Sequence, residues 1–172
     1  LSGFRGWAGM YYMSPPLALA GAWYTMMRTV GLDNSLTGVV LAHAVLNLPM
    51  AVWLMGVFVS DVPIELEEAA RIDGASTPTV LWLVVVPIIT PGLAATGILT
   101  FVFSWNEFAV ALTLTMKQTA TVPVAIAKFA QEYEILYTQM AAAAALSILP
   151  ALVLLIIGQR YIVAGLTQGA VK

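Results

Sequence analysis

Long apolar stretches alternate with short charged ones along this 172-residue chain. Four runs contain no Asp, Glu, Lys or Arg: residues 6–27, 34–60, 74–106 and 135–159. Each is longer than the about 20 residues that a helix needs to cross the hydrocarbon core of a membrane. The runs are continuously apolar, whereas the strands of a membrane barrel alternate apolar and polar positions. The pattern therefore predicts four membrane-spanning helices and an all-α polytopic bundle.

Composition agrees with a membrane protein and argues against two kinds of binding site. Hydrophobic residues make up 60% of the chain, charged residues make up 9%, and the mean hydropathy is +0.91. A net charge of −2 with only seven Lys and Arg residues argues against a nucleic-acid surface. The absence of cysteine and the presence of a single histidine, His43, argue against a metal centre built from Cys and His ligands.

One charged segment, residues 60–87, interrupts the apolar sequence. It contains five of the nine acidic residues of the chain. Each would cost about 3 kcal/mol in the hydrocarbon core even on a lenient insertion scale, so we expect the segment to lie outside the bilayer. The five are Asp61, Glu65, Glu67, Glu68 and Asp73.

Capping residues within this segment predict a helix, a corner and a second helix. Ser60 or Asp61 is expected to cap the first helix, and Pro63 suits its first turn. Gly74 is expected to end that helix, because glycine tolerates the left-handed backbone common at helix ends. The second helix is then expected to start, with Ser76, Thr77 and Pro78 as its cap and first-turn residues.

The first of these two helices is expected to carry two different faces. Residues three and four apart share one side of a helix, so the sequence predicts a small apolar face and a charged one. The apolar face comprises Leu66, Ala69, Ala70 and Ile72, and the charged face comprises Glu65, Glu68 and Arg71.

The same segment resembles the Glu-Ala-Ala loop of the membrane permeases of ATP-binding-cassette (ABC) importers. The matching residues are Glu68, Ala69, Ala70, Gly74, Val84, Val86 and Pro87. Further stretches resemble the smaller permease subunit of the maltose-type, carbohydrate-uptake branch. They are RIDGAS at 71–76, FSWNEF at 103–108, AAAAALSILP at 141–150 and QRYIVAGLTQGAVK at 159–172.

The resemblance covers essentially the whole chain and implies its organisation. It implies the type I ABC importer permease fold, with residues 1–172 as one transmembrane domain that corresponds to the last four of six spans. It also implies a cytoplasmic coupling loop at 60–87, an external loop at 115–139 and a cytoplasmic tail at 164–172. The expected location is the plasma (inner) membrane of a bacterium or archaeon.

The resemblance further implies a function and a set of partners. A permease of this family translocates a carbohydrate or related polyol by alternating access, driven by a separate dimer of ABC ATPases. The other expected partners are a second, homologous permease subunit, an extracytoplasmic solute-binding protein and membrane lipid. ATP and Mg²⁺ would be bound by the partner subunits, because this chain has no glycine-rich phosphate-binding loop and is expected to need no cofactor of its own.

Candidate site residues fall into three groups. The resemblance assigns ATPase coupling to Glu68, Ala69, Ala70, Arg71, Asp73, Gly74 and Pro87, and a tail contact to Gln168 and Lys172. Polar residues in or beside the spans, namely Asn47, Asn106 and Glu107, are candidates for the solute pathway. For Glu107 the alternative is a satisfied structural charge near the interface, and for His43 and Asn47 it is hydrogen bonding between helices.

Three other interpretations compete with the importer. A solvated amphipathic connector would explain the 60–87 segment without a partner. An ion-coupled secondary transporter fragment would suit proline-broken spans and a buried carboxylate, but it needs no docking helix. An intramembrane hydrolase is disfavoured, because His43 has no glycine-flanked serine motif beside it. The identity of the solute is not readable from these residues.

Overall fold

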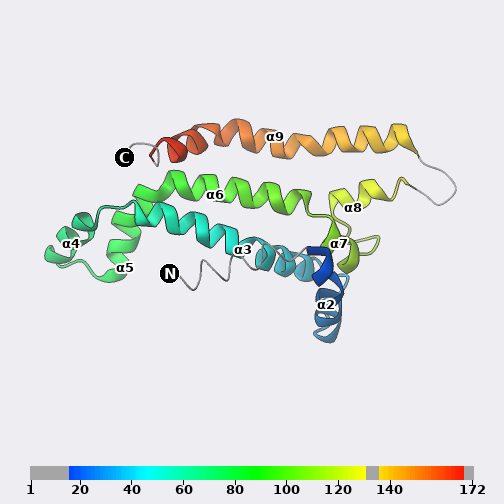
Figure 1. Cartoon of the computed structure of the whole chain (residues 1–172), viewed down its shortest axis with the longest axis horizontal. Coiled ribbons are helices and arrows are strands. Elements are labelled where there is room, and N and C mark those ends of the chain that lie inside the picture. The colour runs from blue at the N-terminus through cyan, green and yellow to red at the C-terminus, as the bar shows by residue number, and fades with distance from the viewer. Residues whose placement is uncertain (1–15, 131–135, 169–172) are drawn as a thin grey trace. The chain divides into compact units, whose positions relative to one another are not determined.

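The computed structural model describes residues 16–130 and 136–168, and side chains from 18 to 159 within them. The elements follow one another as α2 (Pro16–Thr29), α3 (Leu36–Ser60), α4 (Ile64–Ile72), α5 (Thr77–Val80), the π-helix η1 (Leu81–Val85), α6 (Val86–Asn106), α7 (Ala109–Leu114), α8 (Val122–Ala127) and α9 (Tyr137–Gln168). Figure 1 shows them in chain order, from blue α2 to red at the end of α9. The all-α prediction is confirmed.

Three of the four predicted spans are present as long apolar helices. In the described part of the chain, the helices long and apolar enough to cross a membrane are Leu36–Ser60, Thr77–Asn106 and Tyr137–Gln159. The first predicted span, residues 6–27, lies partly outside the described residues. Its described part belongs to α2, which has 14 residues and is shorter than a span by itself.

Contacts divide the chain into two compact units, and the division cuts α3, α6 and α9. The first unit holds residues 1–49 and 101–153, and the second holds residues 50–100 and 154–172. In the first unit α2 packs against α7. The core of that unit consists of Met27, Ala42, Val110 and Leu114, with Trp23, Tyr24, Leu32 and Leu46 packed around it.

The second unit contains the charged segment. Its core consists of Val80, Val85 and Ile89. Partly buried side chains from α3, α4, the turns beside α4 and η1 pack against this core: Met55, Phe58, Val62, Ala70, Ala75 and Val84. The charged segment is therefore attached to the start of the Thr77–Asn106 helix by apolar contacts.

Candidate functional site

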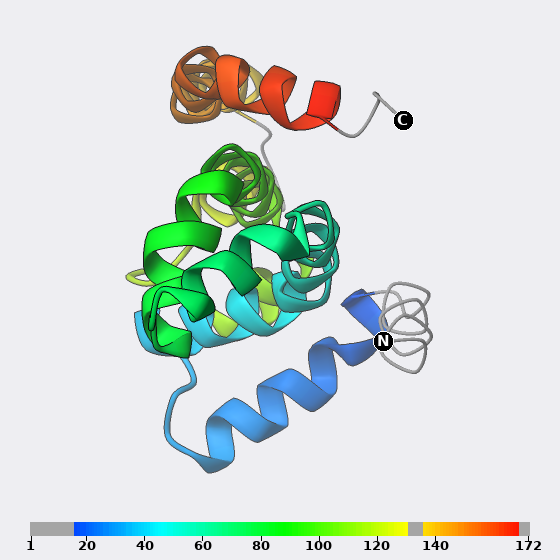
Figure 2. The same cartoon turned by 90° about the vertical axis from the view of Figure 1, so that its left-hand side faces the viewer.

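The charged segment, residues 60–87, forms a helix, a corner and a second helix as predicted, but the first helix begins later than expected. Helix α3 continues through Ser60, whose hydroxyl donates a hydrogen bond to the Val57 carbonyl 2.7 Å away in its own helix. Helix α4 begins at Ile64 with Pro63 as its N-cap, and no side chain caps it. The expected cap by Ser60 or Asp61 was wrong, because the preceding helix uses Ser60 itself. Figures 1 and 2 show the short helix and the corner that follows it.

Gly74 ends α4 in the predicted way. Its φ of +86° lies in the left-handed region that side chains disfavour. The Gly74 amide donates to the Arg71 carbonyl and the Ala75 amide donates to the Ala70 carbonyl, both at 3.0 Å. This pair of bonds is the Schellman motif, which satisfies carbonyls left free at a helix end. Ala70 and Ala75, which flank the motif, both pack on the Val80–Val85–Ile89 core.

The second helix also starts where predicted. Ser76 is the N-cap of α5, although its hydroxyl lies 2.8 Å from the Thr79 hydroxyl and caps no amide. The helix then continues without a break through η1 into α6. In η1 the Val86 amide donates to the Leu81 carbonyl, five residues back. This widened turn directly precedes Pro87, whose ring would clash with the Leu83 carbonyl in a regular α-helix.

The two alanines of the Glu-Ala-Ala motif point to different surroundings. Ala70 is half-buried against the core of its unit, whereas Ala69 is exposed. Ile72 is 86% exposed and shares the free side of α4 with Ala69 and Glu68. Of the four residues predicted to form the apolar face, Ala70 packs on the core, whereas Leu66, Ala69 and Ile72 are exposed. What remains free is a mixed surface with charged, small and large apolar side chains.

The remaining polar residues of the corner make local contacts. Arg71 donates to the Glu67 carboxylate, with 3.4 Å between Nη2 and Oε2, one helical turn away. Such an exposed pair contributes little to stability. Asp73 is the C-cap residue, and its amide donates to the Ala69 carbonyl. Arg71 and Asp73 therefore leave most of their polar atoms available at the surface of the corner.

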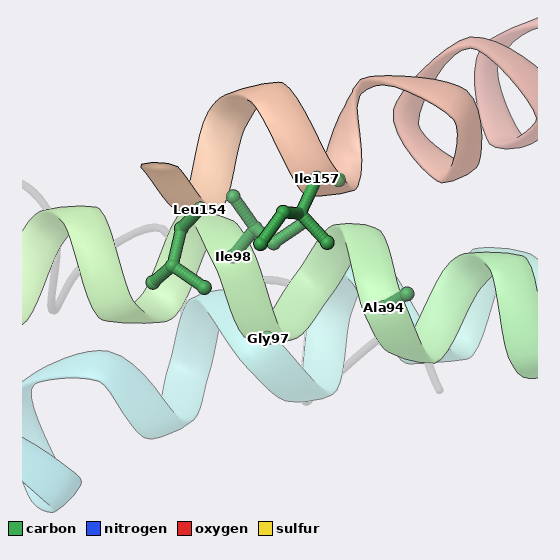
Figure 3. A pocket seen from close by; sticks show the side chains of 6 residues that line it. Ala94, Gly97, Ile98, Leu154 and Ile157 are labelled. Carbon is green, nitrogen blue, oxygen red and sulfur yellow. The ribbon is translucent and has the colours of Figure 1, made fainter. Parts of the chain in front are cut away.

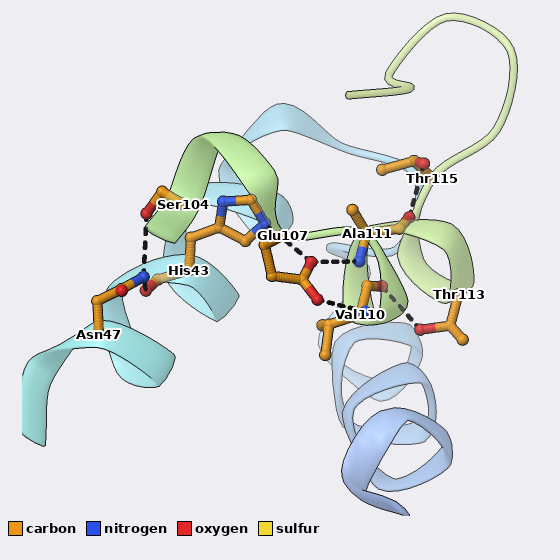
Figure 4. A network of polar contacts seen from close by, with 8 residues as sticks. All are labelled: His43, Asn47, Ser104, Glu107, Val110, Ala111, Thr113 and Thr115. Atoms are coloured by element: carbon orange, nitrogen blue, oxygen red, sulfur yellow. Dashed lines mark hydrogen bonds and ion pairs between the residues drawn. The ribbon is translucent and has the colours of Figure 1, made fainter. Parts of the chain in front are cut away.

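A second polar cluster lies in the first unit, around Glu107 (Figure 4). Its two carboxylate oxygens accept hydrogen bonds from the amides of Val110 at 2.8 Å and Ala111 at 2.9 Å, in the first turn of α7. His43 Nε2 lies 3.3 Å from Glu107 Oε2, close enough to form an ion pair when the histidine is protonated. Glu107 therefore caps α7 and lies beside a histidine of α3.

Asn47 and Asn106 differ in their partners. The Asn47 side chain is buried and donates from Nδ2 to the Ser104 hydroxyl at 3.0 Å and to the His43 carbonyl at 2.8 Å. The first of these bonds links α3 to α6. It is a hydrogen bond between helices, the alternative to a pathway role given above for Asn47. Asn106 is exposed and donates only within α6, to the Val102 carbonyl. The pathway roles of Asn47, Asn106 and Glu107 stay predictions.

The contacts of Asn34 were not expected from the sequence. Asn34 lies in the turn between α2 and α3. Its side-chain oxygen accepts from the Met116 amide at 3.0 Å and from the Thr119 hydroxyl at 2.6 Å. These partners are 82 and 85 residues away along the chain, so no local pattern indicates them.

An apolar groove runs along α6 and α9 in the second unit (Figure 3). Its volume is about 250 Å³, and it is lined by Ala94, Gly97, Ile98, Leu154, Ile157 and Gly158. These side chains offer no hydrogen bond to the hydroxyl groups of a sugar. The groove is therefore not a suitable binding site for a polar solute.

Two further predictions concern metals and the tail. Among the residues described, no group of three or more His, Asp or Glu side chains is placed to hold a metal ion. Gln168 is the last residue of α9, but its side chain and all of Lys172 lie outside the part of the chain whose side chains are described. The tail contact stays a prediction.

Comparison with known proteins agrees with the resemblance seen in the sequence. Residues 3–168 match the family described as "Binding-protein-dependent transport system inner membrane component". The chain is 38% identical over 170 residues to the trehalose transport system permease protein SugB of Mycobacterium tuberculosis, covering 97% of this chain and 62% of that protein. It is 35% identical to the trehalose/maltose transport system permease protein MalG of Thermococcus litoralis, covering 93% and 58%. It is 36% identical to the melibiose/raffinose/stachyose import permease protein MelC of Bacillus subtilis, covering 92% and 58%. The chain thus spans about three fifths of the length of these relatives.

Proposed function

Since the chain belongs to the family of binding-protein-dependent transport system inner membrane components, we propose that it is part of the permease of an ATP-driven carbohydrate importer. Separate ATPase subunits would drive the import of the solute by alternating access. Helix α4 and its corner would be the surface on which an ATPase acts. The predicted type I importer permease fold agrees with this family and with the helical structure.

One observation carries the coupling role: α4 has a free outer side and an anchored inner side. None of its residues is buried, and Glu68, Ala69 and Ile72 lie exposed on the outer side. On the inner side, Ala70 packs on the core formed by Val80, Val85 and Ile89. The core residues belong to the helix that continues into the span Thr77–Asn106. A push on α4 would therefore be transmitted to a membrane-spanning helix through a stiff corner.

The solute and partners follow from the relatives. The names of the three relatives include trehalose, maltose, melibiose, raffinose and stachyose, all of which are carbohydrates. We propose a carbohydrate or related polyol as the solute, without choosing among them. The proposed partners are an ABC ATPase dimer that binds ATP and Mg²⁺, a second permease subunit and a solute-binding protein outside a bacterial or archaeal plasma membrane.

A matched pair of substitutions at Ala69 tests the coupling role. Ala69 is exposed, so a larger side chain there should not disturb the packing of the chain itself. We expect Ala69→Trp to reduce co-purification of the ATPase with the permease by about tenfold or more, because it overfills a docking cleft, while Ala69→Ser keeps it. The measurement is the ratio of ATPase to permease after purification from membranes that contain equal amounts of permease.

The opposite result would favour a different function. If both Ala69 variants retained the full amount of ATPase, α4 would not be the docking helix. If solute uptake by the membranes followed an ion gradient with no ATPase present, the secondary-transporter interpretation would replace the importer.

A further inference from the structure

Asn34 adopts a strained backbone conformation that its surroundings must hold in place. Its φ is +49°, and it is the only non-glycine residue with positive φ among those described. Asparagine tolerates this region better than most residues, but the conformation still has an energetic cost. A strained residue that persists calls for an account of what holds it.

All the described hydrogen bonds of Asn34 go to one distant segment. The Asn34 amide donates to the Leu114 carbonyl at 3.0 Å, at the end of α7. Its side-chain oxygen accepts from Met116 and Thr119, in the turn that follows α7. Main chain and side chain together fasten the α2–α3 turn to residues 114–119. We call this set of contacts the Asn34 latch.

Helix α7 is held at its other end as well. Glu107 accepts from the first-turn amides of α7, and Val110, Ala111 and Leu114 are buried in the first unit. Between the end of α7 and Thr119, by contrast, the side chains of Met116, Lys117 and Gln118 are exposed. The latch therefore fixes the place of a short exposed turn, residues 116–118, on a buried helix.

The membrane face of the turn depends on α3, which lies between Asn34 and α4 along the chain. Helix α3 has 25 residues, about 37 Å at 1.5 Å per residue against a hydrocarbon core of roughly 30 Å, so if α3 crosses the membrane its two ends lie on opposite faces. Asn34 precedes its first residue, and α4 follows its last. If an ATPase acts on α4, the partner at the Asn34 end is the solute-binding protein of the family description.

We propose that Asn34 is a positioning residue for transport, which holds the turn 116–118 where the solute-binding protein contacts the permease. This inference rests on the proposed function. Without the latch, the turn would keep the bond from the Met116 amide to the Thr119 hydroxyl and the bond from Lys128 Nζ to the Met116 carbonyl. It would be less ordered, so docking of the binding protein would cost more conformational entropy. The latch removes that cost in advance.

Two substitutions at Asn34 separate the latch from the backbone strain. Asn34→Gly allows the positive φ and removes the side-chain acceptor, whereas Asn34→Asp keeps an acceptor oxygen and also tolerates this φ. In the complete transporter with its ATPase, we would measure ATP hydrolysis against the concentration of solute-loaded binding protein. We expect the Gly variant to need about tenfold more binding protein for half-maximal stimulation, with basal and maximal rates unchanged. The Asp variant should follow the wild-type curve.

A third variant and a second measurement guard against simple misfolding. Thr119→Val removes the hydroxyl that donates to Asn34 and accepts from the Met116 amide, but it leaves the Asn34 bonds with Met116 and Leu114 in place. It should shift the curve in the same direction by less. Trypsin should cleave after Lys117 faster in the Gly variant than in the Asp variant. A merely structural role would lower the maximal rate and leave the half-maximal concentration unchanged.

The outcomes distinguish this inference from the function on which it rests. If wild-type ATP hydrolysis does not respond to the binding protein, the proposed function fails and the inference with it. If the wild type responds and the Gly variant has the same half-maximal concentration, the inference alone is overturned. An equal shift in the Gly and Asp variants overturns it too.

Discussion

The corner around Gly74 and the α7 segment are fixed in different ways. The bonds that end α4 join residues three to five positions apart, such as Ala75 to Ala70, and no residue of α4 is buried. Helix α7 has three buried residues among its six, and the carbonyl of its last residue, Leu114, accepts a hydrogen bond from the amide of the distant residue Asn34. The corner is a local structure with an exposed outer side, whereas α7 is part of the core of its unit.

This difference predicts which property a substitution will change. On the outer side of the corner, substitutions should alter association with the proposed ATPase partner and leave the stability of the chain nearly unchanged. At the ends of α7, they should alter the fold or the placing of the exposed turn. Both parts can abolish transport, but by measurably different routes.

The largest effect on stability is expected at Glu107. Glu107→Ala leaves the amides of Val110 and Ala111 without their acceptor in a partly buried site. Losing two charge-assisted hydrogen bonds should lower the free energy of unfolding by about 3 kcal/mol. The measurement is the thermal unfolding of the purified permease in detergent, with Glu107→Gln, which keeps one acceptor oxygen, as the control of intermediate stability.

The same experiment also tests the pathway role of Glu107. If Glu107→Ala left the melting temperature unchanged but stopped uptake, capping would not be its function and contact with the solute would be favoured. If stability and uptake fell together and Glu107→Gln restored part of both, the capping role would account for the residue.

A smaller effect is expected at Gly74. A Cβ there would meet no atom within 4 Å, so the cost of Gly74→Ala comes from the positive φ alone. That cost is about 1 kcal/mol, and Gly74→Asn should cost less because asparagine tolerates this conformation. The loss should appear as a weaker ATPase association, in the order Gly, Asn, Ala, at constant permease content of the membrane.

An equal loss in both variants would contradict this order. It would mean that the glycine is needed for close approach of the partner and not for its backbone angle. The corner would then be part of the docking surface at Gly74 as well as at Ala69.

Local features of this protein were predictable from sequence, and features that depend on distant contacts were not. Gly74 ends α4 and Ser76 starts the next helix as predicted, because caps depend on neighbouring residues. The predicted cap by Ser60 or Asp61 was wrong because α3 continues through Ser60, which the neighbouring residues alone do not indicate. The burial of Ala70 and the bonds of Asn34 depend on elements that fold against them, so composition and spacing do not indicate them.

The central claim is that α4 meets an ATPase on the cytoplasmic side, and labelling of single cysteines tests it most directly. The chain contains no cysteine, so Glu68→Cys and Lys117→Cys each provide one thiol on an exposed residue. In oriented vesicles, a membrane-impermeant maleimide should reach Glu68→Cys only from the cytoplasmic side, with protection when the ATPase is bound, and Lys117→Cys only from the opposite side. Labelling of Glu68→Cys from outside the cell, or without any protection by the ATPase, would contradict the claim.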